Sequence, residues 1–196
     1  MVSIDRAHTA LLAMDCQSGI VSQYVNPPDE FLGRATHALK AARSAGIAVI
    51  HVRVGFRPGL PEIGERNKLF AAVKLSPQYQ KLFNGPAGDV HPALGPESGD
   101  IVVTKHRVSA FAGTDLEMIL RAKDIRTLVM FGIATSGVVL STLLEASDGD
   151  YDPVVISDCC ADMNADLHHA LLTHLFPRRA TITTSDEFAA ALTTGD

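Results

Sequence analysis

The chain has 196 residues, of which 46% are hydrophobic and 20% are charged, and its formal net charge is −5. This length suits one domain with one core, so we expect a single domain over residues 1–196. The negative charge argues against a nucleic acid or an anionic membrane as the main partner. No segment approaches the roughly 18 uninterrupted apolar residues of a membrane span, and the apolar run before Asp15 is too short for a signal peptide. These features predict a cytoplasmic protein.

Short apolar runs alternate along the chain with longer segments of helical period. The predicted elements in chain order are a strand at 9–14, a helix at 30–44, strands at 47–53 and 100–104, a helix at 115–122, a strand at 127–132, a helix at 136–147, a strand at 153–157, a helix at 165–175, a strand at 181–183 and a helix at 187–192. Gly46 is expected to close the first helix in a left-handed cap. Because the strands are apolar throughout, they belong in a sheet that is covered on both faces. The order predicts an α/β fold with a doubly wound, mostly parallel six-stranded sheet and helices on both faces, in three layers.

The connection between the second and third strands is unusually long. Residues 54–99 contain six prolines and seven glycines. A connection of this length inside one domain is usually functional, so we interpret it as a lid or a pocket wall.

Ligands bind outside the carboxyl ends of the strands in open parallel sheets. The residues at these ends are Asp15, Arg53, Lys105, the turn at 133–136 and Asp158. Each of them alone could be a turn cap or a solvated side chain. Ionisable residues at four strand ends together predict a site at this edge of the sheet.

Four segments resemble the isochorismatase-like superfamily, which includes nicotinamidases, other amidohydrolases and true isochorismatases. They are LLAMDCQSG at 11–19, VVTKHRVSAFAGTDLEMIL at 102–120, FGIATSGVVLST at 131–142 and SDCCAD at 157–162. Each motif alone is weak, but the four occur in the family's order through nearly the whole chain. The resemblance therefore implies the superfamily's fold and a hydrolytic site.

The family's catalytic triad consists of Asp, Lys and Cys. The resemblance implies that Asp15 is the general acid/base, that Lys105 is its cationic partner and that Val138 stands at the position of the nucleophile. It also implies a cis peptide bond between Ile133 and Ala134, with the backbone of Ile133, Ala134 and Val138 forming an oxyanion-type site. Valine has no lone pair to attack a carbonyl, so no acyl-enzyme can form there.

Other nucleophiles are weaker candidates. Cys16 follows Asp15 directly and would point to the opposite face of the strand. Cys159 and Cys160 are interpreted as buried, reduced structural thiols, since adjacent cysteines form a disulfide with difficulty. Ser136 and Ser141 offer hydroxyl groups, although serine at these helix positions more often caps the helix or bonds backward.

Isochorismatases have a small residue at the cysteine position and hydrolyse a vinyl ether, whose alkene carbon is protonated by the Asp. The sequence therefore favours vinyl-ether-type hydrolysis of a small organic substrate over amide cleavage. The alternative is a non-catalytic small-molecule binding or regulatory protein with the same fold. A nucleotide-binding protein is less favoured, since no Gly-x-Gly-x-x-Gly follows the first strand.

The expected ligands of this site are limited to a small-molecule substrate. The expected substrate-binding residues are Gln17, Arg53, Phe56, Arg66, Phe111 and Thr135. Isochorismatases use a pocket arginine for their dicarboxylate substrate, and Arg53, Arg57 and Arg66 are the candidates. We expect no metal and no cofactor: His51 is interpreted as a core histidine, and His168, His169 and His174 as surface or capping residues. Relatives usually self-associate, which implies a homo-oligomer.

Overall fold

Six apolar segments form one sheet whose strands lie in the order β3-β2-β1-β4-β5-β6, and each pair of neighbouring strands is parallel. The computed structural model describes residues 4–193. The strands are β1 Thr9–Met14, β2 Ala48–Val54, β3 Ile101–Lys105, β4 Thr127–Ile133, β5 Asp152–Ala161 and β6 Thr181–Thr183. The doubly wound sheet expected from the sequence is confirmed, and it is wholly rather than mostly parallel.

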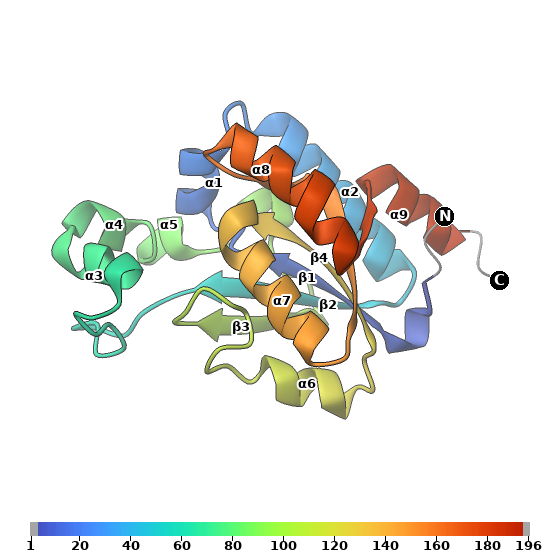
Figure 1. Cartoon of the computed structure of the whole chain (residues 1–196), viewed down its shortest axis with the longest axis horizontal. Helices are drawn as coiled ribbons and strands as arrows, with labels where there is room; N and C mark the ends of the chain where they lie inside the picture. The colour runs from blue at the N-terminus through green and yellow to red at the C-terminus, as the bar shows by residue number, and fades with distance from the viewer. Residues whose placement is uncertain (1–3, 194–196) are drawn as a thin grey trace.

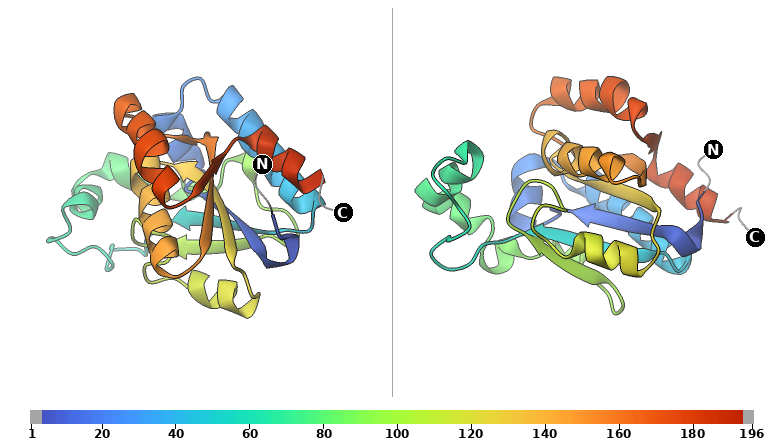
Figure 2. Two further views of the ribbon diagram at one scale, coloured as in Figure 1. Left: turned by 45° about the vertical axis from the view of Figure 1, so that its right-hand side comes forward. Right: turned by 60° about the horizontal axis from the view of Figure 1, so that its bottom comes forward.

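Helices cover both faces of the sheet and complete a three-layer arrangement (Figures 1 and 2). The helices are α1 Ser18–Tyr24, α2 Asp29–Ser44, α3 Lys68–Leu75, α4 Pro77–Lys81, α5 Gly85–Gly88, α6 Leu116–Ala122, α7 Leu140–Asp148, α8 Ala165–Ala170 and α9 Ser185–Thr193. The α2 and α9 helices pack on each other against one face, and α7 and α8 lie on the opposite face. Thr135–Val139 is a π-helical turn that leads into α7.

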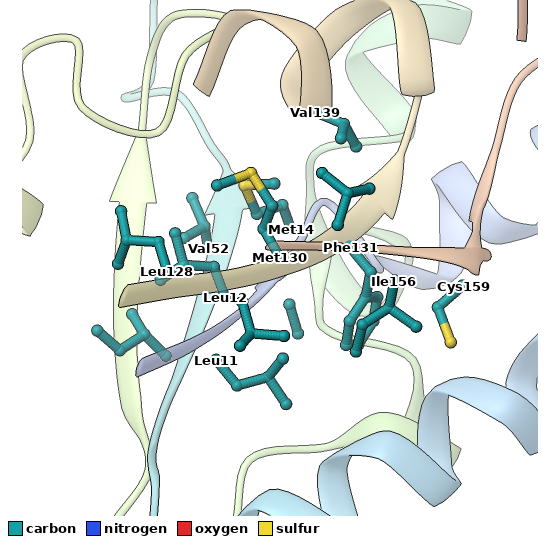
Figure 3. Close-up of a cluster of buried hydrophobic side chains, with 14 of the residues drawn as sticks. Leu11, Leu12, Met14, Val52, Leu128, Met130, Phe131, Val139, Ile156 and Cys159 are labelled. Carbon is teal, nitrogen blue, oxygen red and sulfur yellow. The ribbon is translucent and has the colours of Figure 1, made fainter. Parts of the chain in front are cut away.

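The core is built around β1 and β4 at the centre of the sheet. All six residues of β1 are buried, and Leu11, Leu12, Met130 and Phe131 belong to the cluster that Figure 3 shows. Burying one side chain of this size contributes roughly 1.5–3 kcal/mol. The apolar strands therefore fix the positions of their own carboxyl ends, where the chain turns out of the sheet.

The turn after β1 places Asp15 at this edge. Asp15 has a left-handed backbone conformation with a φ of 55°, which aspartate tolerates better than most residues. Its backbone N–H still donates to the Val52 carbonyl oxygen at 2.8 Å. The residue therefore remains attached to β2 while the chain leaves β1.

The long connection between β2 and β3 forms a separate wall. It contains α3, α4 and α5, which stand beyond the carboxyl ends of β2 and β3 (Figure 1). Ile63, Phe70 and Val73 form a small buried cluster within it. Phe56 packs edge-on against the Phe70 and Phe83 rings, at centroid distances of 5.8 Å and 5.6 Å. The wall thus has apolar packing of its own.

Several observed elements differ from the prediction. Helices α1, α3, α4 and α5 were not expected, and β5 runs four residues past its predicted end at Ser157. Asp158 consequently lies within β5, where its carboxylate accepts bonds from the Ser185 N–H and hydroxyl at 2.8 Å each and caps α9. The predicted cap at Gly46 is present, with a φ of 73°. Among residues 4–193, no helix has the length and apolar character needed to cross a membrane.

Candidate active site

A buried ion pair joins the ends of β1 and β3. Lys105 Nζ lies 2.9 Å from Asp15 Oδ2 and also donates to the Arg107 carbonyl oxygen at 3.0 Å. Lys105 is 2% exposed and Asp15 is 6% exposed. The other carboxylate oxygen, Asp15 Oδ1, is buried without a hydrogen-bond partner. A buried acceptor without a partner is costly, so this oxygen is available to a substrate or a water molecule.

Burial and the ammonium group act on Asp15 in opposite directions. Burial raises the pKa of the Asp15 carboxyl above its ordinary value, while the charge and the hydrogen bond of Lys105 lower it, and burial prevails. A raised pKa increases the fraction of the neutral acid near neutral pH. The pair can therefore hold a proton at Asp15 and stabilise the carboxylate after that proton leaves.

The ion pair lies in a pocket of about 750 Å³. Its most buried lining residues include Asp15, Lys105, Ile133 and Val138. One side consists of residues from the long connection, chiefly of α3 and its neighbours, which agrees with the predicted pocket wall. Four exposed residues with large side chains, Leu69, Tyr79, Met163 and Leu167, form what we call the rim of the pocket, and the exposed residues Gln23, Ala72 and Asn164 also line it.

The turn after β4 enters this pocket. The peptide bond between Ile133 and Ala134 is cis, where the family resemblance implies one. The Ala134 carbonyl oxygen accepts bonds from the N–H groups of Gly137 and Val139. The Asp162 carboxylate accepts the Ser136 N–H at 2.8 Å and the Ser136 hydroxyl at 2.7 Å. These bonds fix the start of the helical segment, and Val138, 2% exposed, lines the pocket beside Asp15 and Lys105.

The cysteines of the chain are unpaired and buried, and the pocket lining includes none of them. Burial raises the pKa values of the Cys16 and Cys159 thiols far above their ordinary range and that of Cys160 to about 12. Because the thiolate is the nucleophilic form, these thiols are poorly suited to attack a substrate.

The family profile of the isochorismatase domain matches residues 9–187. This chain belongs to the isochorismatase family. An uncharacterized isochorismatase family protein of Escherichia coli O157:H7 is 32% identical over 195 residues, which are 98% of this chain and 100% of that protein. A ureidoacrylate amidohydrolase of Methylorubrum extorquens is 34% identical over 176 residues, 80% of this chain and 71% of that protein. The solved structure of an isochorismatase family protein from Burkholderia thailandensis matches with a TM-score of 0.85 at 32% identity and covers 98% of each chain.

Six side chains expected to contact the substrate lie outside the pocket of this isochorismatase-family chain. Gln17 is wholly buried, and its amide bonds to the Val54 N–H, the Val54 carbonyl and the Gly88 carbonyl. Thr135 is also buried and bonds to the Ala161 carbonyl and to His168 Nδ1. Both side chains are committed to bonds with backbone groups of the protein.

The pocket lining also lacks the other four of these residues, Arg53, Phe56, Arg66 and Phe111. Phe111 stacks near Tyr151 on the side of α6 and α7, with ring centroids 6.0 Å apart. Arg53 and Phe56 line a separate cavity of about 440 Å³, and Arg66 is exposed and lines neither cavity. These four residues therefore do not belong to the lining of the pocket that holds Asp15 and Lys105, and their contact with a substrate stays a prediction.

Other residues of this isochorismatase-family pocket were not anticipated. Tyr24 from α1 and Asp162 after β5 both line it. Burial raises the pKa of the Tyr24 phenol, and the nearby charge of Asp162 adds to this effect. Burial opposes ionisation of Asp162, but the bonds from Ser136 prevail and lower the pKa of this carboxyl. Asp162 belongs to the SDCCAD motif; no sequence signal marks Tyr24.

The histidines do not form a metal centre in the part of the chain that the structure describes, and no group of three or more potential metal ligands occurs there. His51 is buried in β2 and bonds to Asp100, in agreement with a core role. His168 is half-buried against Thr135, whereas His174 is exposed.

Proposed function

We propose that this chain is a hydrolase of a small organic substrate, in which Asp15 is the general acid/base and Lys105 is its partner. The observation that carries the proposal is the buried ion pair whose free oxygen, Asp15 Oδ1, has no bond within the protein. A structural ion pair has no need of an unsatisfied oxygen in a pocket. A general acid needs an oxygen without a partner in the protein, at the pocket, and a raised pKa, and Asp15 has both.

Vinyl-ether-type hydrolysis is the preferred reaction. In the first step the neutral Asp15 carboxyl gives its proton to the alkene carbon, which leaves an oxocarbenium ion and a carboxylate beside Lys105. Water then adds to the cationic carbon and returns a proton to Asp15, and the resulting hemiketal separates into an alcohol and a carbonyl compound. The ammonium group of Lys105 stabilises the carboxylate formed in the first step.

Amide cleavage through a covalent intermediate is less favoured for this chain. The name of the Methylorubrum extorquens relative indicates amide hydrolysis in that protein. Here Val138 is proposed to replace the nucleophilic cysteine, and the three thiols are buried outside the pocket lining. Amide hydrolysis in this pocket would therefore require direct attack by water.

The test compares the wild type with Asp15→Asn on vinyl ethers, amides and carbamates. Asparagine keeps the shape of the side chain but cannot donate and recover the proton. We expect kcat on the active substrate to fall by about 10²–10⁴-fold, the usual contribution of a general acid. Asp166→Asn, which changes an exposed residue of α8, is the matched control and should keep full activity. An Asp15→Asn variant with unchanged kcat would refute the role of Asp15.

A non-catalytic binding or regulatory protein is the second candidate. Val138 at the nucleophile position favours it, since a valine there is compatible with a pocket that only binds. Ligand binding without turnover of any substrate in the panel would support this candidate over the hydrolase.

We also propose that the protein self-associates and works in the cytoplasm. The edge strand β3, with its exposed Val102, supports the first point, and three unpaired thiols support a reducing compartment. Light scattering during size-exclusion chromatography tests the subunit count, and a monomer at micromolar concentration would contradict self-association.

A further inference from the structure

The charged groups that line the pocket are already bonded within the protein. Three charged residues line it: Asp15, Lys105 and Asp162. Asp15 and Lys105 form the buried pair, and the Asp162 carboxylate holds the Ser136 N–H and hydroxyl. Among residues 4–193, neither an arginine nor a histidine belongs to the lining. The described pocket therefore offers no uncommitted cation to an anionic ligand.

The nearby arginines are bound elsewhere. Arg53 pairs with Asp89 at 3.3 Å, and Arg57 pairs with Glu62 at 2.6 Å. Arg107 donates from one nitrogen to the His106 carbonyl and from another to the Glu62 carbonyl. The arginine that a dicarboxylate substrate requires was expected among Arg53, Arg57 and Arg66, and none of these three lines the pocket.

The remaining surface of the pocket is largely apolar from its interior to its rim. The lining includes Ile20 and Val108, together with Phe70, Val73, Leu82 and Phe83 of the wall. At the rim, Leu69 is 62% exposed, Met163 is 65% exposed, Tyr79 is 44% exposed and Leu167 is 42% exposed. Large apolar side chains around the mouth of a cavity are typical of a surface that a ligand covers.

We propose, on the basis of the proposed hydrolytic function, that the substrate carries no negative charge and has a sizeable aliphatic or aromatic body. Its scissile polar group lies at Asp15 and Lys105, and its body lies along the apolar wall and reaches the rim. A carboxylate on that body would lose its hydration beside Asp162 without gaining a cation, which is unfavourable. Small dicarboxylates are thereby excluded as good substrates.

A pair of fluorescent probes tests the pocket without any need for turnover. N-phenylnaphthylamine is neutral, and anilinonaphthalene sulfonate has the same ring system with one negative charge. We expect the neutral probe to bind at least about tenfold more tightly than the sulfonate in a fluorescence titration. Equal affinity, tighter binding of the sulfonate, or the absence of binding by either probe would overturn the proposal.

Two leucines of α3 provide matched variants that locate the binding. Leu69 and Leu75 are both exposed, but only Leu69 belongs to the pocket lining. Leu69→Arg adds a free cation at the rim, so the sulfonate should bind at least about fivefold more tightly and the neutral probe more weakly. Leu75→Arg should change neither affinity. Identical behaviour of the two variants would place the probes elsewhere and refute the assignment to this pocket.

Turnover separates this inference from the proposed function. Once an active neutral substrate is known, its analogue with a carboxylate on the part of the body that lies along the apolar wall should have a kcat/KM lower by about 100-fold or more. If the analogue reacts equally well, the inferred substrate class is refuted, whereas the proposed hydrolytic function is not. If the probes behave as expected but Asp15→Asn keeps full activity, the inferred class of ligand is supported and the proposed role of Asp15 as general acid/base is refuted.

Discussion

The protonation state of Asp15 determines which chemistry this pocket can perform. Because burial raises the pKa of Asp15, activity as a general acid should be present at low pH and lost as the pH rises through that raised value. Lys105→Met removes the group that opposes the shift. We therefore expect the alkaline limb of the kcat profile to move to higher pH in this variant, with Lys74→Met on α3 as an unaffected control. An alkaline limb at the same pH in both variants would mean that another group controls the reaction.

Val138 permits a direct test of the nucleophile position. In Val138→Cys, the start of a helix and the nearby Lys105 both favour a thiolate, so the pKa of the new thiol should lie below about 8.5. The change in size is small and should cost less than about 1.5 kcal/mol. We expect iodoacetamide to modify one thiol per chain near neutral pH, as mass spectrometry can count. The wild type is the control, since its three thiols are buried and have raised pKa values. If the introduced thiol is inert while the variant stays folded, the assignment of position 138 is contradicted.

At the level of elements, the strands could be predicted because most of their residues are apolar, and the central strands β1 and β4 are buried on both faces. Asp15 and Lys105 were found by the same logic, since each follows or ends such a strand. The hydrogen bonds of Gln17 could not be predicted, because its partners, Val54 and Gly88, are 37 and 71 residues away in the sequence. The apolar wall was anticipated only as a long connection, because short helices within a segment rich in proline and glycine leave no clear period.

The contact between β1 and β4 depends on the absence of a side chain at Gly132. A Cβ at this position would overlap the Met14 carbonyl oxygen, whereas a Cβ at Gly33 on the exposed side of α2 would meet nothing within 4 Å. Gly132→Ala should therefore lower the free energy of unfolding by at least about 2 kcal/mol, and the melting temperature by roughly 4–8 °C. Gly33→Ala should instead stabilise the protein by about 0.5–1 kcal/mol, since alanine is the better helix former. Equal melting temperatures for the two variants would show that β1 and β4 can move apart at Gly132 without loss of stability.

Across the whole molecule, a second buried charge cluster lies away from the site, near the amino end of β3. Asp100 accepts a bond from Arg43 Nη2 at 2.6 Å and lies 3.1 Å from His51 Nε2. His51 is 1% exposed, and its Nδ1 has no hydrogen-bond partner. Burial lowers the pKa of His51 despite the opposing effect of Asp100. For Asp100, burial acts to raise the pKa, but the hydrogen bonds with Arg43, the Glu97 backbone N–H and His51 prevail and lower it.

Both shifts make the folded protein less stable in acid. The unfolded chain binds a proton at His51 near its ordinary pKa of about 6.5, whereas the folded protein resists it. Stability from this group is therefore complete above that pH and lost as the pH falls below it, and Asp100 adds a further loss at lower pH. In His51→Gln the amide can still donate to Asp100 but cannot titrate. We expect the loss of unfolding free energy between pH 7 and 5, measured by urea denaturation, to be smaller in His51→Gln than in the wild type. His174→Gln, at an exposed position of the chain, should retain the wild-type dependence on pH. A dependence that is unchanged in His51→Gln would mean that the acid sensitivity arises from other groups.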